Sequence, residues 1–430
     1  MTNPANPTNA PAADTPQAAS VGVAQTPQAP KKVLMKGNEV LAESAIRAGC
    51  RFFFGYPITP QTELAAYMSK RMPKVGGTYL QAESEISAIN MVYGAAAAGA
   101  RAMTSSSSPG VSLKGEGVSY MAGADLPGVI INVQRGGPGL GGIQPSQSDY
   151  WQATRAMGHG DFFMPVFAPS TVQEMADLVY HAFDVADQYR TPVMILADGM
   201  LGQMMEPVVL PPQRSLSELP AKPWATAGTH NARAHNVVNS LYLTPDELER
   251  TNVERFERYE QIKATEQRAE TFLVEDADVV VVAFGASARI ARSAVVSARA
   301  RGIRAGLLRP ITLWPFTVDA IEQVLGHGAR AFLSVEMNMG QMVDDVRLAV
   351  NGRAPVSFFG RTGGIIPTPE EVLTHIEQAA REIGAPCGEP AACGASAPAG
   401  TGATAGAEAP ASTPAETPAA DASTEKGGDR

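Results

Sequence analysis

The sequence predicts an α/β fold in which a parallel sheet is covered by helices on both faces. Short runs of apolar residues alternate with longer segments whose apolar residues recur at helical spacing. Most of the residues in the short runs are apolar, without strict alternation with polar residues, which is typical of strands that are buried on both faces. With 430 residues, 44% of them hydrophobic and 18% charged, the chain is long enough for more than one core.

A first domain is expected at residues 33–210, where strands and helices alternate along the chain. The predicted helices cover residues 38–48, 85–100 and 172–186, and the predicted strands cover residues 52–54, 101–104, 128–133 and 192–197. The four serines at 105–108 are expected to form a turn. The helix at 85–100 is rich in small residues, so it permits close packing with a neighbour.

Prolines then lead into a linker at residues 211–274 that contains a charged helix. Thr244-Pro245-Asp246-Glu247 has the pattern of a capping box with proline at the first helical position, so the helix should begin there and run toward Glu270. Its charges are expected to face solvent. The residues of its predicted inward face are Phe256, Tyr259, Ile262, Ala269 and Leu273.

A second α/β domain is expected at residues 275–385. Its predicted strands cover residues 279–284, 305–308 and 331–335, and its predicted helices cover residues 287–301 and 318–325. The turn Phe284-Gly285-Ala286-Ser287 is either an anion site at a helix N-terminus or an ordinary connection. Residues 336–342 contain three methionines and are expected to form an interface loop.

The two ends of the chain differ from its middle in composition. Residues 1–32 and 386–430 are dominated by small residues and proline, which bury too little apolar surface to fold, so both are predicted to be disordered tails. The start lacks the features of a signal peptide, and no run approaches about 18 apolar residues, so a cytoplasmic protein without membrane contact is expected. A net charge of −9 without a basic stripe argues against a nucleic-acid partner.

The cysteines are Cys50, Cys387 and Cys393. They form no Cys-x-x-Cys pair, so neither a zinc site nor an iron–sulfur cluster is predicted on this chain. Any electron-carrying cluster is therefore expected on another chain.

The turn after the strand at 52–54 is the first candidate site. Pro57 and Pro60 restrict the backbone of the sequence Gly-Tyr-Pro-Ile-Thr-Pro, so Thr59 is held on a stiff loop. In open α/β sheets, ligands bind at the carboxyl ends of the strands. The Thr59 hydroxyl is therefore expected at the ligand-binding edge of the sheet.

Two acids, Glu83 and Glu85, stand at the start of the helix predicted at 85–100. Residues two apart do not face each other on a helix, which argues against a pair of glycosidase carboxylates. Attraction to the positive end of the helix is the simplest explanation for both. The smooth, closely packing helix that follows Glu85 favours a functional role for this residue.

A glycine-rich loop follows the strand at 128–133. The glycines of residues 137–142 match the spacing of a dinucleotide fingerprint, with Asp161 downstream. A true fingerprint opens an apolar helix, whereas polar residues follow here, so we interpret the match as false. Arg135 is the better candidate, because a guanidinium at the carboxyl end of a strand can bind a carboxylate, while a surface salt bridge is its simpler use.

Together these segments resemble the alpha subunit of 2-oxoacid:ferredoxin oxidoreductases. The resemblance covers nearly all of residues 33–385 and depends on five motifs in the order of the family. The motifs are Gly55-Tyr56-Pro57-Ile58-Thr59-Pro60, Glu85 with Gly94, Gly99-Ala100-Arg101-Ala102-Met103-Thr104-Ser105-Ser106, Leu126-Pro127-Gly128 and Val133-Gln134-Arg135. Within the family, Arg-Gly-Gly-Pro-Gly-Leu-Gly and Ile-Gln-Pro-Ser-Gln resemble the branched-chain (2-oxoisovalerate) type, and the 2-oxoglutarate type is the alternative.

The resemblance implies a thiamine diphosphate enzyme with a pyrimidine-binding domain followed by a transketolase-C-terminal-like domain. It implies oxidative decarboxylation of a 2-oxoacid with coenzyme A and electron transfer to ferredoxin. The Gly-Asp-Gly motif that binds diphosphate and Mg²⁺ does not occur in the sequence. The resemblance therefore implies a hetero-oligomer, in which a beta subunit supplies the diphosphate and Mg²⁺ site and gamma and ferredoxin-like subunits carry the iron–sulfur clusters.

The resemblance also implies roles for individual residues. Glu85 matches the catalytic glutamate that hydrogen-bonds N1′ of the cofactor's aminopyrimidine, and Pro57 lies in the loop against the cofactor. Thr59 matches the residue that hydrogen-bonds the substrate carboxylate. Arg135 matches the arginine that reaches cofactor and substrate, and no metal ligand is implied on this chain.

Two other classes of function stay open from the residues alone. An NAD-dependent dehydrogenase would use Gly137 to Gly142, and the isolated chain would then bind NAD(H). A non-catalytic scaffold would use the domains and tails to bind partners, and it would tolerate substitution of Thr59 and Arg135.

Overall fold

The computed structural model describes residues 31–155 and 157–386. Most of both predicted tails, with Cys387 and Cys393, lies outside the described residues. No described helix has the length and the apolar composition needed to cross a bilayer. The cytoplasmic location stays a prediction.

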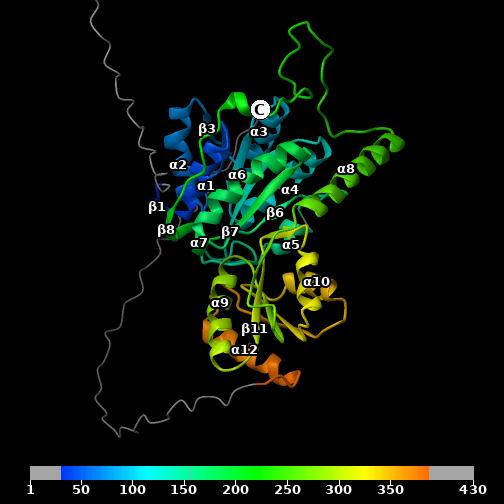
Figure 1. Ribbon diagram of the computed structural model, residues 1–430. Coiled ribbons are helices and arrows are strands. Elements are labelled where there is room, and N and C mark those ends of the chain that lie inside the picture. The colour runs from blue at the N-terminus through cyan, green and yellow to red at the C-terminus, as the bar shows by residue number, and fades with distance from the viewer. Residues whose placement is uncertain (1–30, 156, 387–430) are drawn as a thin grey trace, which may run out of the picture. The chain divides into compact units, whose positions relative to one another are not determined.

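A seven-stranded sheet forms the first part of the chain (Figure 1). Its order is β12-β6-β7-β5-β4-β2-β3, and all neighbours are parallel except β12, which pairs antiparallel with β6. The chain passes from β2 to β3 on one side and then returns to β4 on the other, so the topological switch point lies at β2. The strands are β2 (Phe52–Gly55), β3 (Thr78–Gln81), β4 (Ala102–Ser106), β5 (Gly128–Gln134), β6 (Val166–Phe167), β7 (Pro192–Asp198) and β12 (Thr312–Trp314).

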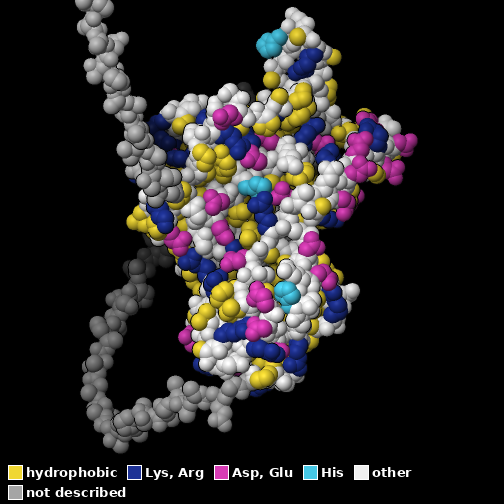
Figure 2. Space-filling model, viewed as in Figure 1, with side chains coloured by type: hydrophobic (Ala, Val, Ile, Leu, Met, Phe, Trp, Pro, Cys, Tyr) yellow, Lys and Arg dark blue, Asp and Glu magenta, His cyan; other side chains and the backbone are white. Residues whose placement is uncertain are grey.

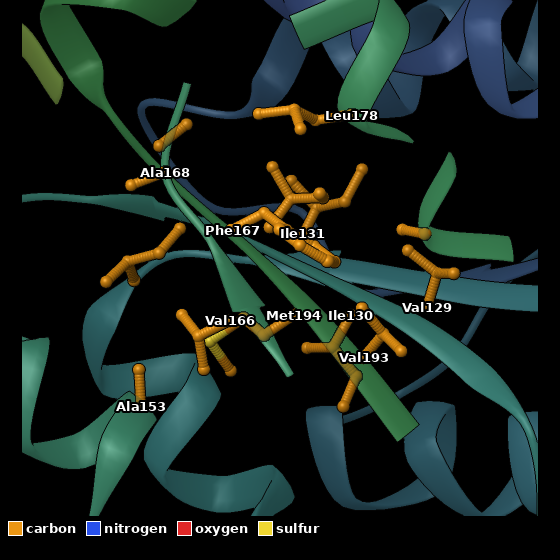
Figure 3. Packing of buried hydrophobic residues seen from close by; sticks show 14 of the residues in the cluster. Val129, Ile130, Ile131, Ala153, Val166, Phe167, Ala168, Leu178, Val193 and Met194 are labelled. Carbon is orange, nitrogen blue, oxygen red and sulfur yellow. The ribbon is translucent and has the colours of Figure 1, made fainter. Parts of the chain in front are cut away.

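Helices cover both faces of this sheet, as the continuous apolar runs predict. Every residue of β5 and β7 is buried. In Figure 3, Leu178 and Ala153 lie on opposite sides of these strands. The helices are α1 (Gly37–Arg47), α2 (Thr62–Arg71), α3 (Glu85–Ala97), α4 (Ser108–Gly123), α5 (Tyr150–Thr154), α6 (Val172–Tyr189) and α7 (Gly199–Gln203), and a two-stranded sheet pairs β1 (Val33–Lys36) with β8 (Met205–Val208).

The predicted serine turn at 105–108 is wrong. Ser105 and Ser106 belong to β4, and Ser108 is the first residue of α4. The sequence did not predict α4 because glycine and serine are common in it and weaken the helical pattern. The helix α2 was also missed.

A five-stranded sheet forms the second part of the chain. Its order is β14-β13-β10-β11-β9, parallel except for β9. The strands are β9 (Ala269–Phe272), β10 (Val279–Val282), β11 (Ala305–Pro310), β13 (Ala331–Glu336) and β14 (Val356–Gly360), and the helices are α9 (Gly285–Ala300), α10 (Val318–Gly326), α11 (Met342–Val350) and α12 (Pro369–Glu382). The strand β12 leaves this part and joins the first sheet.

The charged linker helix α8 (Pro245–Thr265) begins where it was predicted, but Thr244 makes no side-chain capping hydrogen bond. It ends before Glu270 because the following residues join the second sheet as β9. Of its predicted inward face, Tyr259 and Ile262 are buried, while Phe256 is 37% exposed. The acidic side chains at the start of α8 are exposed and gather on the surface in Figure 2.

Candidate active site

The sequence-predicted site residues follow different strands of the first sheet at its carboxyl edge. Thr59 follows β2, Glu85 follows β3 and Arg135 follows β5. This edge at the switch point is where open α/β sheets bind ligands. The first turn of α4 lies between these residues, because Ser108 contacts Arg135 and Gly110 lies against Glu85.

The turn that carries Thr59 is held by neighbouring side chains. Asn38 Nδ2 donates to the Pro60 carbonyl at 2.8 Å, and Ser105 Oγ donates to Gln61 Oε1 at 2.6 Å. Pro57 and Thr59 remain exposed. The turn is thus fixed from within the protein, while the Thr59 side chain is accessible to a ligand.

Arg135 is brought into direct contact with this turn. Its Nη1 donates to the Thr59 carbonyl and its Nη2 donates to the Leu140 carbonyl, each at 3.0 Å. The side chain belongs to a residue that is 6% exposed, and its Nε has no hydrogen-bond partner in the part of the chain that the structure describes. No carboxylate among the same residues forms an ion pair with it. The interpretation of Arg135 as a surface salt bridge is therefore wrong, because the guanidinium is buried and binds main-chain carbonyls.

Glu85 is the first residue of α3 and is 5% exposed. A Cβ placed on Gly110 would come within 3.0 Å of both Glu85 Oε1 and Ser106 Oγ, so the carboxylate reaches the first turn of α4. The hydroxyl of Ser106 is buried and lacks a partner within residues 31–155 and 157–386, as does that of Thr104. Buried polar groups normally have partners, so this cluster has the character of a binding site.

Glu83 lies apart from this cluster. It is exposed, and its carboxylate accepts a hydrogen bond from the Ser87 hydroxyl. The two acids therefore do not act jointly, which agrees with the prediction from their spacing.

The glycine-rich loop folds back on itself. The Gly136 amide donates to the Gln144 carbonyl and the Gly142 amide donates to the Gly136 carbonyl, both at 2.9 Å. The next helix, α5, begins at Tyr150, so no helix N-terminus follows the glycines directly. The dinucleotide fingerprint lacks its structural basis here.

The turn at 284–287 is used to join the two sheets. Gln147 Nε2 donates to the Phe284 carbonyl at 2.8 Å, and Ser287 Oγ donates to Gln147 Oε1 at 2.5 Å. Asp198 also accepts a hydrogen bond from the Ala286 amide, and burial raises the pKa of Asp198 to about 6. Protein groups therefore occupy this helix start, and the anion-site alternative is wrong.

The predicted interface loop at 336–342 contacts the first part of the same chain. The Met337 carbonyl accepts from the Gln147 amide at 3.0 Å, and Asn338 Nδ2 donates to the Gln147 carbonyl at 2.8 Å. The loop therefore forms an interface within the chain.

The sequence did not single out Lys114, which lies on α4 beside Glu85. Lys114 is 0% exposed, and its Nζ donates to the Glu85 main-chain carbonyl at 3.5 Å. Burial lowers its pKa to about 8. Its signal in the sequence is a lysine flanked by Gly110 and Gly117 at helical spacing, which becomes visible once α4 is known.

Comparison with known proteins identifies the family. Residues 43–275 match the family model "Pyruvate flavodoxin/ferredoxin oxidoreductase, thiamine diP-bdg", and residues 277–372 match "Pyruvate:ferredoxin oxidoreductase core domain II". The chain is 50% identical over 347 residues to ketoisovalerate oxidoreductase subunit VorB of Methanothermobacter thermautotrophicus, a match that covers 81% of this chain and 97% of the relative. The chain belongs to the 2-oxoacid:ferredoxin oxidoreductase family. The resemblance to its alpha-type subunits is thereby confirmed.

Other relatives of the 2-oxoacid:ferredoxin oxidoreductase chain are more distant. Its identity to 2-oxoglutarate synthase subunit KorA of the same organism is 36% over 377 residues, covering 80% of this chain and 98% of the relative. A 2-oxoglutarate:ferredoxin oxidoreductase structure from Magnetococcus marinus, with 2-oxoglutarate, coenzyme A and succinyl-CoA bound, has a TM-score of 0.72 and 27% identity. That match covers 82% of this chain and 66% of the other, longer chain.

A split-gene transketolase shares the fold, with a TM-score of 0.50 and 13% identity over 81% of this chain and 99% of that chain. The predicted fold class is confirmed, and the matched thiamine diphosphate-binding family model supports the predicted cofactor. These findings favour an oxidoreductase subunit over an NAD-dependent dehydrogenase or a scaffold.

Proposed function

We propose that this chain is the subunit that binds the pyrimidine half of thiamine diphosphate in an oxidoreductase for branched-chain 2-oxoacids such as 2-oxoisovalerate. The buried Glu85 carboxylate at the first turn of α4, the same turn whose Ser108 contacts Arg135, carries the proposal of catalysis. The identity to the ketoisovalerate subunit, 50% against 36% for the 2-oxoglutarate subunit, supports the substrate class.

The residues fit the aminopyrimidine of the cofactor. Glu85 is buried beside unpartnered hydroxyls of the described residues and would hold N1′, with Pro57 in the adjoining turn. Its place at the start of α3 stabilises the ionised carboxylate through the helix dipole. When bound, thiamine diphosphate supplies the carbanion-stabilising centre that decarboxylation of a 2-oxoacid requires.

Arg135 and Thr59 would bind and orient the carboxylate of the substrate. The guanidinium is largely withdrawn from water, which strengthens its attraction to an anion. The hydrogen bond from Arg135 Nη1 to the Thr59 carbonyl fixes the two residues relative to each other. Such fixed donors align the oxoacid before the reaction and lower its entropic cost.

The proposal includes partner subunits. No group of three potential metal ligands is found among residues 31–155 and 157–386, and Cys50, the one cysteine there, is buried with its pKa raised to about 12 by burial. A beta subunit would therefore supply the diphosphate and Mg²⁺ site, and gamma and ferredoxin-like subunits would carry the iron–sulfur clusters. Electrons would pass to ferredoxin, and coenzyme A would accept the acyl group.

The catalytic assignment is tested by comparing Glu85→Gln with Glu83→Gln in the complex co-purified with its partner subunits. Glu85→Gln is expected to lower oxoacid-dependent ferredoxin reduction by at least about 100-fold, because the carboxylate that holds N1′ is lost. Glu83→Gln changes an exposed acid two residues away and should leave the rate unchanged. Full activity of Glu85→Gln would refute the assignment.

The substrate class is tested by kcat/KM for 2-oxoisovalerate, 2-oxoglutarate, pyruvate and indolepyruvate with coenzyme A and ferredoxin. We expect 2-oxoisovalerate to be preferred by at least about tenfold, the discrimination that one or two methyl groups provide in an apolar pocket. A preference for 2-oxoglutarate would overturn the substrate class and leave the reaction type in place.

A further inference from the structure

Lys114 is a fully buried lysine beside the candidate active site. Its Nζ donates one hydrogen bond among the described residues, to the Glu85 main-chain carbonyl at 3.5 Å, which is long for a hydrogen bond. No carboxylate in that part of the chain forms an ion pair with it. Lysine is almost never fully buried without a partner, so a stabilising role in the core does not account for it.

The packing of α3 on α4 directs Lys114 toward Glu85. Gly110, Lys114 and Gly117 recur at helical spacing and share one face of α4. A Cβ on Gly110 would come within 3.0 Å of Glu85 Oε1, and a Cβ on Gly117 would come within 3.0 Å of Ile89. Both glycines therefore face α3, and the lysine stands between them at the contact of the two helices.

The charges of Lys114 and Glu85 act on each other in this contact. Burial lowers the pKa of Lys114, and the negative charge of Glu85 raises it in opposition. Glu85, from α3, is the one titratable group among the described residues that acts on Lys114. Opposite charges removed from water interact strongly, because the surroundings screen them little.

We propose that Lys114 is a positioning residue for Glu85, because its buried Nζ holds the Glu85 main-chain carbonyl and brings a counter-charge to the helix contact where the Glu85 carboxylate meets the first turn of α4. This inference rests on the proposed function, in which Glu85 holds N1′. Arg135 lies at a different part of the site, where its Nη1 and Nη2 donate to the Thr59 and Leu140 carbonyls.

The first test is the pH profile of kcat/KM for Lys114→Met in the co-purified complex. Methionine keeps the length of the side chain and removes both the charge and the hydrogen-bond donor, so Glu85 loses its counter-charge. We expect the acidic limb to move about 1 unit to higher pH. Lys70→Met, which changes an exposed lysine of α2, is the matched control and should leave the profile unchanged. A Lys114→Met profile identical to that of the wild type would overturn the inference.

The second test measures the urea unfolding midpoint of the full chain and does not require activity. Lys114→Met should raise the midpoint more in a Glu85→Gln background than in the wild type, because only the wild type loses the attraction between the two charges. Lys114→Gln provides a second neutral variant for the same cycle. Equal shifts in the two backgrounds would overturn the inference.

The two proposals fail in different ways. Full activity of Glu85→Gln would refute the catalytic assignment itself. An inactive Glu85→Gln together with an unchanged Lys114→Met pH profile would refute the positioning role of Lys114 alone.

Discussion

Replacing Lys114 by methionine is expected to stabilise the folded chain at neutral pH, although the residue belongs to a functional site. The substitution removes a fully buried charge and keeps an unbranched side chain of similar length. The pKa of Lys114 is lowered from 10.5 to about 8 by burial. This difference corresponds to about 3 kcal/mol of folding free energy.

The pH dependence of the stability gain distinguishes an effect of the lost charge from an effect of changed packing. The unfolded lysine holds its proton up to pH 10.5, whereas the folded one releases it above about pH 8. Between these values the unfolded state binds more protons, so the stability of the wild type rises with pH. The destabilisation of the wild type by the buried ammonium is fully present below about pH 8 and is lost near pH 10.5. The gain from Lys114→Met should therefore be about 3 kcal/mol at pH 7 and should disappear toward pH 10.5.

Urea unfolding of the full chain at pH 7, 8, 9 and 10 measures this gain, with Lys70→Met as the control at each pH. The midpoints can be compared if the unfolding free energy falls with urea concentration at the same slope in wild type and variant. A loss of stability at pH 7 would refute the reasoning. A gain that is the same at pH 7 and pH 10 would attribute the effect to packing instead of charge.

Three further predictions concern the surroundings of the site. Gly110→Ala should lower kcat/KM by about 100-fold or more, because its Cβ would displace Glu85. A Cβ at Gly94 in α3 meets no atom of the described residues within 4 Å, so Gly94→Ala should keep full activity, and similar rates for the two variants would contradict this. Arg135→Lys should lower kcat/KM by about 100-fold and speed proteolysis at 136–144, because lysine lacks the planar fork whose two nitrogens bind the Thr59 and Leu140 carbonyls. An unchanged cleavage rate would count against the anchoring role. Glu336→Gln should cost about 2 kcal/mol in urea unfolding, because this buried carboxylate accepts three amide hydrogen bonds at the start of α11; an unchanged midpoint would contradict it.

The central strands β5 and β7 were predictable because their residue types indicate burial. The run at 192–197 is apolar throughout and the run at 128–133 is apolar except for Asn132, and the structure buries both β5 and β7 completely. The helix α4 was not predictable in the same way, since its buried face consists of glycines that pack on α3. A face made of small residues has no apolar period to detect, and tertiary packing outweighs its weak helix propensity.

The position of the candidate site could be predicted from the sequence, whereas the contacts between its residues could not. Thr59 and Arg135 each follow a strand, so their position at the carboxyl edge follows from the order of elements. The bond between Arg135 and the Thr59 carbonyl links β5 to the turn after β2, and no local pattern reports it. Lys114 was missed for the same reason as α4.

The capping-box pattern occurs at two helices, and whether its hydrogen bonds form depends on the surrounding tertiary structure. Thr368 accepts from the Glu371 amide at 3.2 Å and Glu371 Oε2 accepts from the Thr368 amide at 2.8 Å, so this box forms at α12. Thr244 has the same pattern at α8 and makes no such side-chain bond. The two helices begin where the pattern predicts, yet the bond itself depends on how the preceding segment enters the helix.

The charged groups of the site are placed before any partner binds. Glu85, Lys114 and Arg135 are each at most 6% exposed and lie against the ends of rigid strands and helices, whereas Pro57 and Thr59 are exposed. Charges held in place and away from water need little reorganisation during a reaction, and this preorganisation is a large part of catalysis. In the proposed complex, the cost of burying these charges is therefore met when this chain folds, and the partner subunit closes a site whose electrostatics are already set.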